Sequence, residues 1–201
     1  MRTLAPTLTA ALALALSGVA AAAQDPRLER LEPGARPLVA AVIDSARALG
    51  LPTEALVQRA LEGATKRAPG ALIVVAVRSL AADLSRARDP LGLGSSPAEL
   101  EAGAAALRAG AGPALLGELR RARGGRSLAV PLAVLTDLVA SGVPADSAGA
   151  AVLALASRSR DADLVEFRRA VERDIALGAP PAAAASVRLN AAAREARPGR
   201  P

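Results

Sequence analysis

The chain has 201 residues, of which 52% are hydrophobic and 22% are charged, and its formal net charge is +6. It contains no Cys, His, Trp or Tyr, one Met and one Phe, so the sequence excludes disulfides, thiol nucleophiles, imidazole general bases and soft-metal sites. Any core must therefore consist mainly of Leu, Val, Ile and Ala, whose small side chains favour close packing of helices.

The first 23 residues have the pattern of a secretory signal peptide. A short basic region with Arg2 is followed by an apolar stretch over about 8–20 and by three alanines at 21–23. The apolar stretch is shorter than the roughly 20 residues of a membrane span, which favours cleavage before Gln24 over an uncleaved membrane anchor. We expect an exported protein, periplasmic or extracellular, that has lost residues 1–23.

The remainder divides into a lead-in, a helical domain and a tail. Residues 24–36 are polar and contain two prolines, which predicts a flexible lead-in. Over 37–178, apolar residues recur at helical spacing between Gly and Pro breaks. The predicted helices cover about 37–50, 52–66, 70–86, 97–110, 113–123, 127–141, 144–158 and 161–177. Residues 179–201 are rich in Ala, Pro and Arg, which predicts a mobile tail, although the alanine run could extend as a helix.

Two glycine-containing segments raise the question of nucleotide binding, and neither has the pattern of a nucleotide-binding loop. Residues 63–66, Gly-Ala-Thr-Lys, lack the second glycine and the Lys-Ser/Thr order of a phosphate-binding loop, so Lys66 is interpreted as a solvated helix-end lysine. Residues 89–97 do not fit a dinucleotide fingerprint, and Ser96 with Glu99 matches a capping box at the start of a helix. The sequence predicts no cofactor.

An internal duplication relates two parts of the chain by a shift of 92 residues. It aligns Gly50 with Gly142 and Pro52 with Pro144, and after the loss of one residue it aligns Ile73 with Leu164. Each unit is a turn and two amphipathic helices, which must stack on neighbouring units to bury their apolar faces. We therefore predict an all-α fold of about seven or eight helices, either a short irregular helical repeat (solenoid-like) or a compact multi-helix bundle.

A carboxylate cluster supports the one enzymatic alternative. Asp161, Asp163 and Glu166 could form an acid/base pair or a weak calcium site. The preferred interpretation is structural, with Asp161 capping a helix and the other two in its solvated first turn. No catalytic or metal-binding residue is predicted.

The densest basic cluster consists of Arg120, Arg121, Arg123 and Arg126. It lies at a predicted helix C-terminus, where cations complement the helix dipole, and it is also a possible contact for an anionic partner or membrane surface. Nucleic acid is not expected, because the chain lacks aromatic stacking residues and is predicted to be exported. The leading hypothesis is an exported non-enzymatic binding or scaffolding protein of a bacterial envelope with a protein partner. A carboxylate-dependent envelope enzyme and a peripheral membrane-surface protein are the alternatives.

Overall fold

The computed structural model of the chain describes residues 25–195. Within that part the chain forms one 3-10 helix and nine α-helices and no β-strand, so the predicted all-α class is confirmed. The elements are η1 (Pro26–Arg30), α1 (Arg36–Ala48), α2 (Thr53–Thr65), α3 (Gly70–Leu91), α4 (Pro97–Arg108), α5 (Pro113–Arg123), α6 (Ala129–Ala140), α7 (Ala145–Ala156), α8 (Asp161–Ala176) and α9 (Pro181–Glu195).

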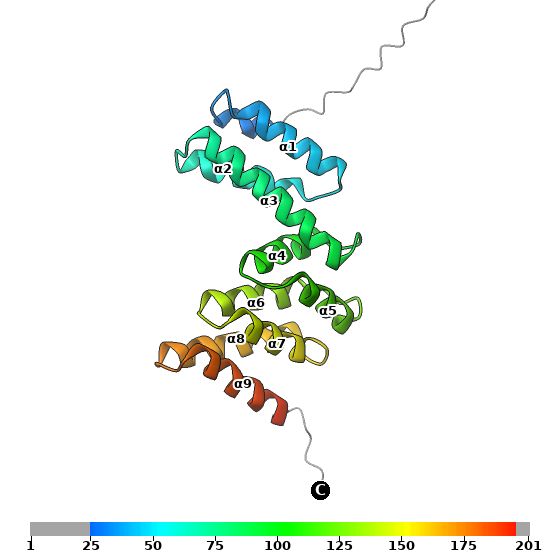
Figure 1. Cartoon of the computed structure of the whole chain (residues 1–201), viewed down its shortest axis with the longest axis vertical. Helices are drawn as coiled ribbons and strands as arrows, with labels where there is room; N and C mark the ends of the chain where they lie inside the picture. The colour runs from blue at the N-terminus through cyan, green and yellow to red at the C-terminus, as the bar shows by residue number, and fades with distance from the viewer. Residues whose placement is uncertain (1–24, 196–201) are drawn as a thin grey trace, which may run out of the picture.

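The helices are arranged along the long axis of the molecule, with α1 near one end and α9 at the other (Figure 1). One row of contacts joins α3, α4, α6 and α8, and a second row joins α5, α7 and α9. The long helix α3 contacts α1 and α2 as well as α4 and α5, so it links the first helix pair to the rest of the stack. The buried apolar residues form one cluster that extends along the molecule.

The same glycine turn ends four of these helices. Gly50, Gly110, Gly142 and Gly178 all have positive φ, and in each case the following residue donates its backbone N–H to the carbonyl five residues earlier. This is the Schellman motif, which favours glycine because a Cβ is unfavourable in a left-handed conformation. Gly50 and Gly142, which the sequence aligns, thus have matching backbone turns, and α1 with α2 corresponds to α6 with α7.

The N-terminal segment differs from the predicted flexible lead-in over 24–36. Residues 26–30 form η1, and Leu28 and Leu31 are each only 3% exposed. The η1 segment packs against α1 and α2, and Nη1 and Nη2 of Arg27 both donate to the carboxylate of Glu54. The segment is polar overall, but its two leucines cover the apolar end of the first helix pair.

The C-terminal segment contains a helix, as in the alternative interpretation of the alanine run. Helix α9 buries Ala184 and Ala185, and Arg188 forms a salt bridge of 2.6 Å with Asp174 of α8. The predicted signal peptide (1–23) lies outside the described residues, as do positions 196–201 of the predicted tail.

The segment that resembled a phosphate loop is helical. Gly63 lies inside α2, where a Cβ would be 2.8 Å from Cγ1 of Ile73, so this glycine permits close packing of α2 on α3. Lys66 is the C-cap residue of α2, and its Nζ lies 2.5 Å from Oε1 of Glu62.

Candidate binding groove

An open apolar groove lies between α1 and α3. The two helices run side by side in the same direction, because contacts join both pairs of ends. Near the N-terminal ends, Gly70 donates its N–H to Oε2 of Glu32 at 3.2 Å, and near the C-terminal ends Arg88 donates to the carbonyl of Leu49. The groove between them has a volume of about 420 Å³.

Aliphatic side chains line most of this groove. On α1, the lining residues Leu38, Val42, Ser45 and Leu49 recur every three or four positions, so they share one helix face. Leu38 is 47% exposed and Leu49 is 55% exposed, although both are large apolar side chains. Exposed apolar side chains that line a concave surface are typical of a binding site rather than of ordinary solvated surface.

The wall contributed by α3 is formed by small residues and one cation. Ala81, Ala82 and Ser85 leave space for another backbone to approach, and Arg78 is the only ionisable residue among the described residues that line the groove. Arg78 is exposed, and within residues 25–195 it forms no ion pair. The groove therefore presents an apolar surface with a single positive charge.

The corresponding place in the second half of the duplication carries charged side chains instead. There α6 packs on α8, and Nη1 of Arg168 lies 2.9 Å from Oδ2 of Asp137 and 3.4 Å from Oε1 of Glu172. The duplication aligns these three residues with Val77, Ser45 and Ala81 respectively. A three-residue ionic network in one half thus corresponds to uncharged positions in the other.

The predicted basic cluster is divided among several structural contacts. Arg120 donates its Nε–H to the carbonyl of Leu91 at 3.1 Å and lies 3.0 Å from Oε1 of Glu99, so it joins the end of α3 to the start of α4. Arg121 is exposed and, within the part of the chain that the structure describes, forms no ion pair.

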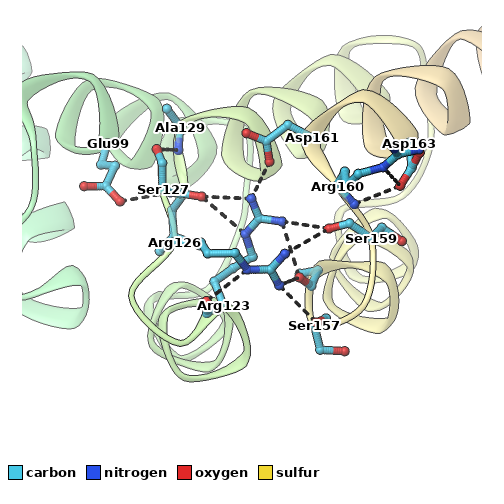
Figure 2. A network of polar contacts seen from close by, with 12 residues as sticks. Glu99, Arg123, Arg126, Ser127, Ala129, Ser157, Ser159, Arg160, Asp161 and Asp163 are labelled. Atoms are coloured by element: carbon cyan, nitrogen blue, oxygen red, sulfur yellow. Dashed lines mark hydrogen bonds and ion pairs between the residues drawn. The ribbon is translucent and has the colours of Figure 1, made fainter.

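Arg123 is the most deeply buried arginine of the cluster, with 3% exposure. Figure 2 shows its guanidinium directed toward the loop between α7 and α8. It donates to the carbonyls of Ser127 and Ser159 and pairs with the carboxylate of Asp161. These contacts join the α5–α6 loop to the α7–α8 loop.

Arg126 satisfies the carbonyls at the end of α7 (Figure 2). Its Nη2 donates to the carbonyls of Ala156 and Ser157 at 2.9 and 3.0 Å, and its Nη1 donates to Ser159 at 3.2 Å. A cation at a helix C-terminus also interacts favourably with the helix dipole. Of the four predicted arginines, only Arg121 directs a guanidinium to solvent without an internal acceptor among residues 25–195.

The predicted capping box at the start of α4 is present and extends into this network. The backbone N–H of Ser96 donates to Oε2 of Glu99, and the N–H of Glu99 donates to the Ser96 hydroxyl. Burial raises the pKa of Glu99, but hydrogen bonds from Ser96 and Leu128 together with the charge of Arg120 outweigh it and hold that pKa below its usual value. Glu99 is therefore a structural carboxylate.

The carboxylates of the enzymatic alternative are each paired with a different arginine. Asp161 pairs with Arg123, Asp163 with Arg160 at 3.1 Å, and Glu166 with Arg169 at 3.1 Å. The capping role that the sequence suggested for Asp161 belongs to Asp163, whose Oδ2 accepts the backbone N–H of Arg160 at 2.8 Å.

Neither a metal centre nor a membrane-spanning helix is found in the described part of the chain. Over residues 25–195, no group of three or more acidic residues is arranged to hold a metal ion. Over the same residues, no helix combines the length and the apolar character that a bilayer crossing requires.

The hydrophobic periodicity of the sequence did not predict the α1–α3 groove. A signal for it is present in the duplication, because Ser45 and Ala81 align with charged residues of the second half. Comparisons with protein-family models, with curated proteins and with solved structures found no match to this chain.

Proposed function

We propose that this chain is an exported, non-enzymatic binding protein of a bacterial envelope, and that the α1–α3 groove holds an apolar helix of a partner protein. The observation that carries the proposal is the contrast between the two halves of the duplication. The groove in the first half is lined by exposed aliphatic side chains, whereas the equivalent place in the second half holds the Asp137–Arg168–Glu172 network.

The dimensions of the groove suit a short helix. From Leu38 to the C-cap residue Leu49, the apolar face of α1 spans twelve residues, which is about 16 Å or three helical turns. The small side chains of Ala81 and Ala82 allow a partner helix to approach α3 closely. An apolar helix face laid into such a groove buries its side chains at i, i+3, i+4 and i+7, which is a common mode of peptide recognition.

A non-enzymatic role agrees with the chemistry of the side chains. The chain has no His or Cys, and Asp161, Asp163 and Glu166 are each paired with an arginine. A catalytic acid or base normally has a shifted pKa and lies in a cleft that also admits a substrate.

Export is proposed from the basic, apolar and small-residue order of residues 1–23. N-terminal sequencing of the protein purified from its native cells tests this point. A mature chain that begins at Gln24 supports export, and a chain that retains Met1 and fractionates with the cytosol contradicts it.

Site-specific photo-cross-linking in native cells tests the groove. A cross-linking side chain at Ala41, which lines the groove, should capture a defined partner segment with an amphipathic helical pattern. The matched control is the aligned and likewise exposed Ala133 of α6. Capture should be lost when Ala81→Glu introduces the residue that the second half has at this position, while circular dichroism shows an unchanged fold. Equal capture from both positions, or capture that survives Ala81→Glu, contradicts the proposal.

A further inference from the structure

We infer that the partner helix carries a carboxylate that pairs with Arg78. This inference rests on the proposed function, because it concerns the chemistry of the occupant of the α1–α3 groove. Within residues 25–195, Arg78 is the only ionisable residue of the groove lining.

The second half of the duplication shows what an arginine at this position pairs with. Arg78 aligns with Arg169 of α8, whose Nη1 lies 3.1 Å from Oε1 of Glu166, three residues earlier in the same helix. The residue aligned with Glu166 is Val75, which is 60% exposed. The first half thus has the arginine, but at the position of the carboxylate that pairs with it in the second half it has an apolar residue.

The other cations near the groove already have partners. Arg47 pairs with Asp44, Arg86 lies 3.5 Å from Asp83, and Arg88 donates to the carbonyl of Leu49. Within the described part of the chain, Arg78 therefore differs from its neighbours in having no acceptor.

Occupation of the groove changes the surroundings of this guanidinium. A helix laid over the aliphatic lining displaces the water that solvates Arg78, and a partly buried charge without a counter-ion opposes binding. A carboxylate on the flank of the partner helix offsets this cost with a charge-assisted, bidentate hydrogen bond. Charge complementarity of this kind selects one partner over others more than it raises affinity.

The position of Arg78 locates the carboxylate along the partner. Gly70 donates its N–H to Glu32 at one end of the α1–α3 pair and Arg88 donates to the carbonyl of Leu49 at the other, so Arg78 lies about midway between the two contacts. The carboxylate should accordingly lie near the middle of the three-turn apolar face and on one flank of it. The apolar segment of this chain over 8–20 contains no Asp or Glu and does not supply this group.

Selection from a displayed library of amphipathic helices tests the inference and does not require an identified partner. The library has an aliphatic face of three turns and randomised flanking positions, and it is selected in parallel against wild type, Arg78→Gln, Val75→Glu and the control Arg169→Gln. Selection against Ala81→Glu identifies the binders that do not use the groove. Circular dichroism of each variant establishes that it is folded.

The expected result is enrichment of Asp or Glu at one central flanking position in selections against wild type and Arg169→Gln. That enrichment should be lost with Arg78→Gln and with Val75→Glu, which supplies an intramolecular carboxylate. A chosen acidic peptide should bind wild type about five-fold more tightly than its Gln counterpart at low ionic strength. Groove-dependent binders without an acidic preference overturn the inference and leave the proposed function intact, whereas absence of any binder sensitive to Ala81→Glu overturns the proposed function itself.

Discussion

Oε1 of Glu99 accepts a hydrogen bond from the backbone N–H of Leu128 at 2.9 Å. A side chain in the first turn of α4 thereby satisfies the N-cap residue of α6, a helix that begins about thirty residues later in the sequence. Because Glu99 is only 5% exposed, water cannot easily replace this acceptor. The carboxylate thus fixes the position of α6 on α4.

Replacement of Glu99 by alanine should destabilise the protein by about 2 to 3 kcal/mol, because the amides of Ser96 and Leu128 and the guanidinium of Arg120 lose their common acceptor. The measurement is urea unfolding followed by far-ultraviolet circular dichroism. Glu101→Ala is the control in the same helix, since Glu101 is exposed, and it should change stability by no more than about 0.5 kcal/mol. Equal effects of the two substitutions would contradict the role assigned to Glu99.

Stability should decrease as the pH falls below about 5, and Glu99 should account for part of the decrease. Its pKa in the folded protein is below 4.5, so the unfolded state binds a proton at a higher pH than the folded state. The stabilisation is complete above the unfolded pKa and is lost as the pH falls through the folded one. Other carboxyl groups contribute in the same direction, including Glu54, whose pKa is lowered to about 2 by hydrogen bonds from Arg27 and Gln58.

Urea unfolding between about pH 6 and pH 3 measures this dependence. The free energy of unfolding of Glu99→Gln should decrease less over this range than that of wild type, because the substituted side chain does not titrate. An acid dependence identical to that of wild type would show that Glu99 is not linked to folding.

The buried Arg123 and the exposed Arg121 should differ sharply in their contribution to stability. Arg123→Gln should cost about 3 kcal/mol, because the carbonyls of Ser127 and Ser159 and the carboxylate of Asp161 lose their donor. Arg121→Gln should cost no more than about 0.5 kcal/mol. Chemical unfolding of both variants provides the comparison, and a cost for Arg123→Gln as small as that for Arg121→Gln would show that the network in Figure 2 does not stabilise the fold.

Local signals explain why the helices could be predicted from the sequence. Gly50 and Gly142 end helices in left-handed turns, and Ser96 with Glu99 forms the predicted capping box, so these boundaries depend on a few neighbouring residues. The predicted end of the third helix at about residue 86 was too early, because α3 continues to Leu91 with a proline in its last turn. Pro90 lacks the N–H that would donate to the carbonyl four residues earlier, and α3 ends one residue after it.

The structural features that the sequence did not predict depend on contacts between residues far apart in the chain. The arginines at 120–126 are close in sequence, but the acceptors of Arg123 and Arg126 lie up to 38 residues away, so their internal roles are visible only in the folded chain. The exposure of Leu38 and Leu49 likewise depends on which helices pack beside α1. Periodicity predicts that an apolar face exists and not whether a neighbour covers it.

Gly142→Ala should destabilise the protein by about 1 to 2 kcal/mol, since φ of Gly142 is 91° and a side chain is unfavourable in this conformation. The added Cβ would also lie 3.3 Å from Cγ of Pro181 at the start of α9. Gly34→Ala is the matched control, because a Cβ at Gly34 meets no atom within 4 Å and its φ is not positive. Thermal unfolding compares the two, and equal melting temperatures would contradict a strained turn at Gly142.

The N-terminal segment provides a test of the difference between the predicted lead-in and the structure. Leu31 is 3% exposed after η1, and Leu93 is 88% exposed in the α3–α4 loop. Leu31→Ala should cost about 2 to 4 kcal/mol, because it removes a buried side chain of the apolar core and leaves a cavity, whereas Leu93→Ala should cost less than about 0.5 kcal/mol. Urea unfolding distinguishes the two cases. A flexible lead-in would give the same small effect for both leucines, so a loss specific to Leu31 would show that the folded domain begins before α1.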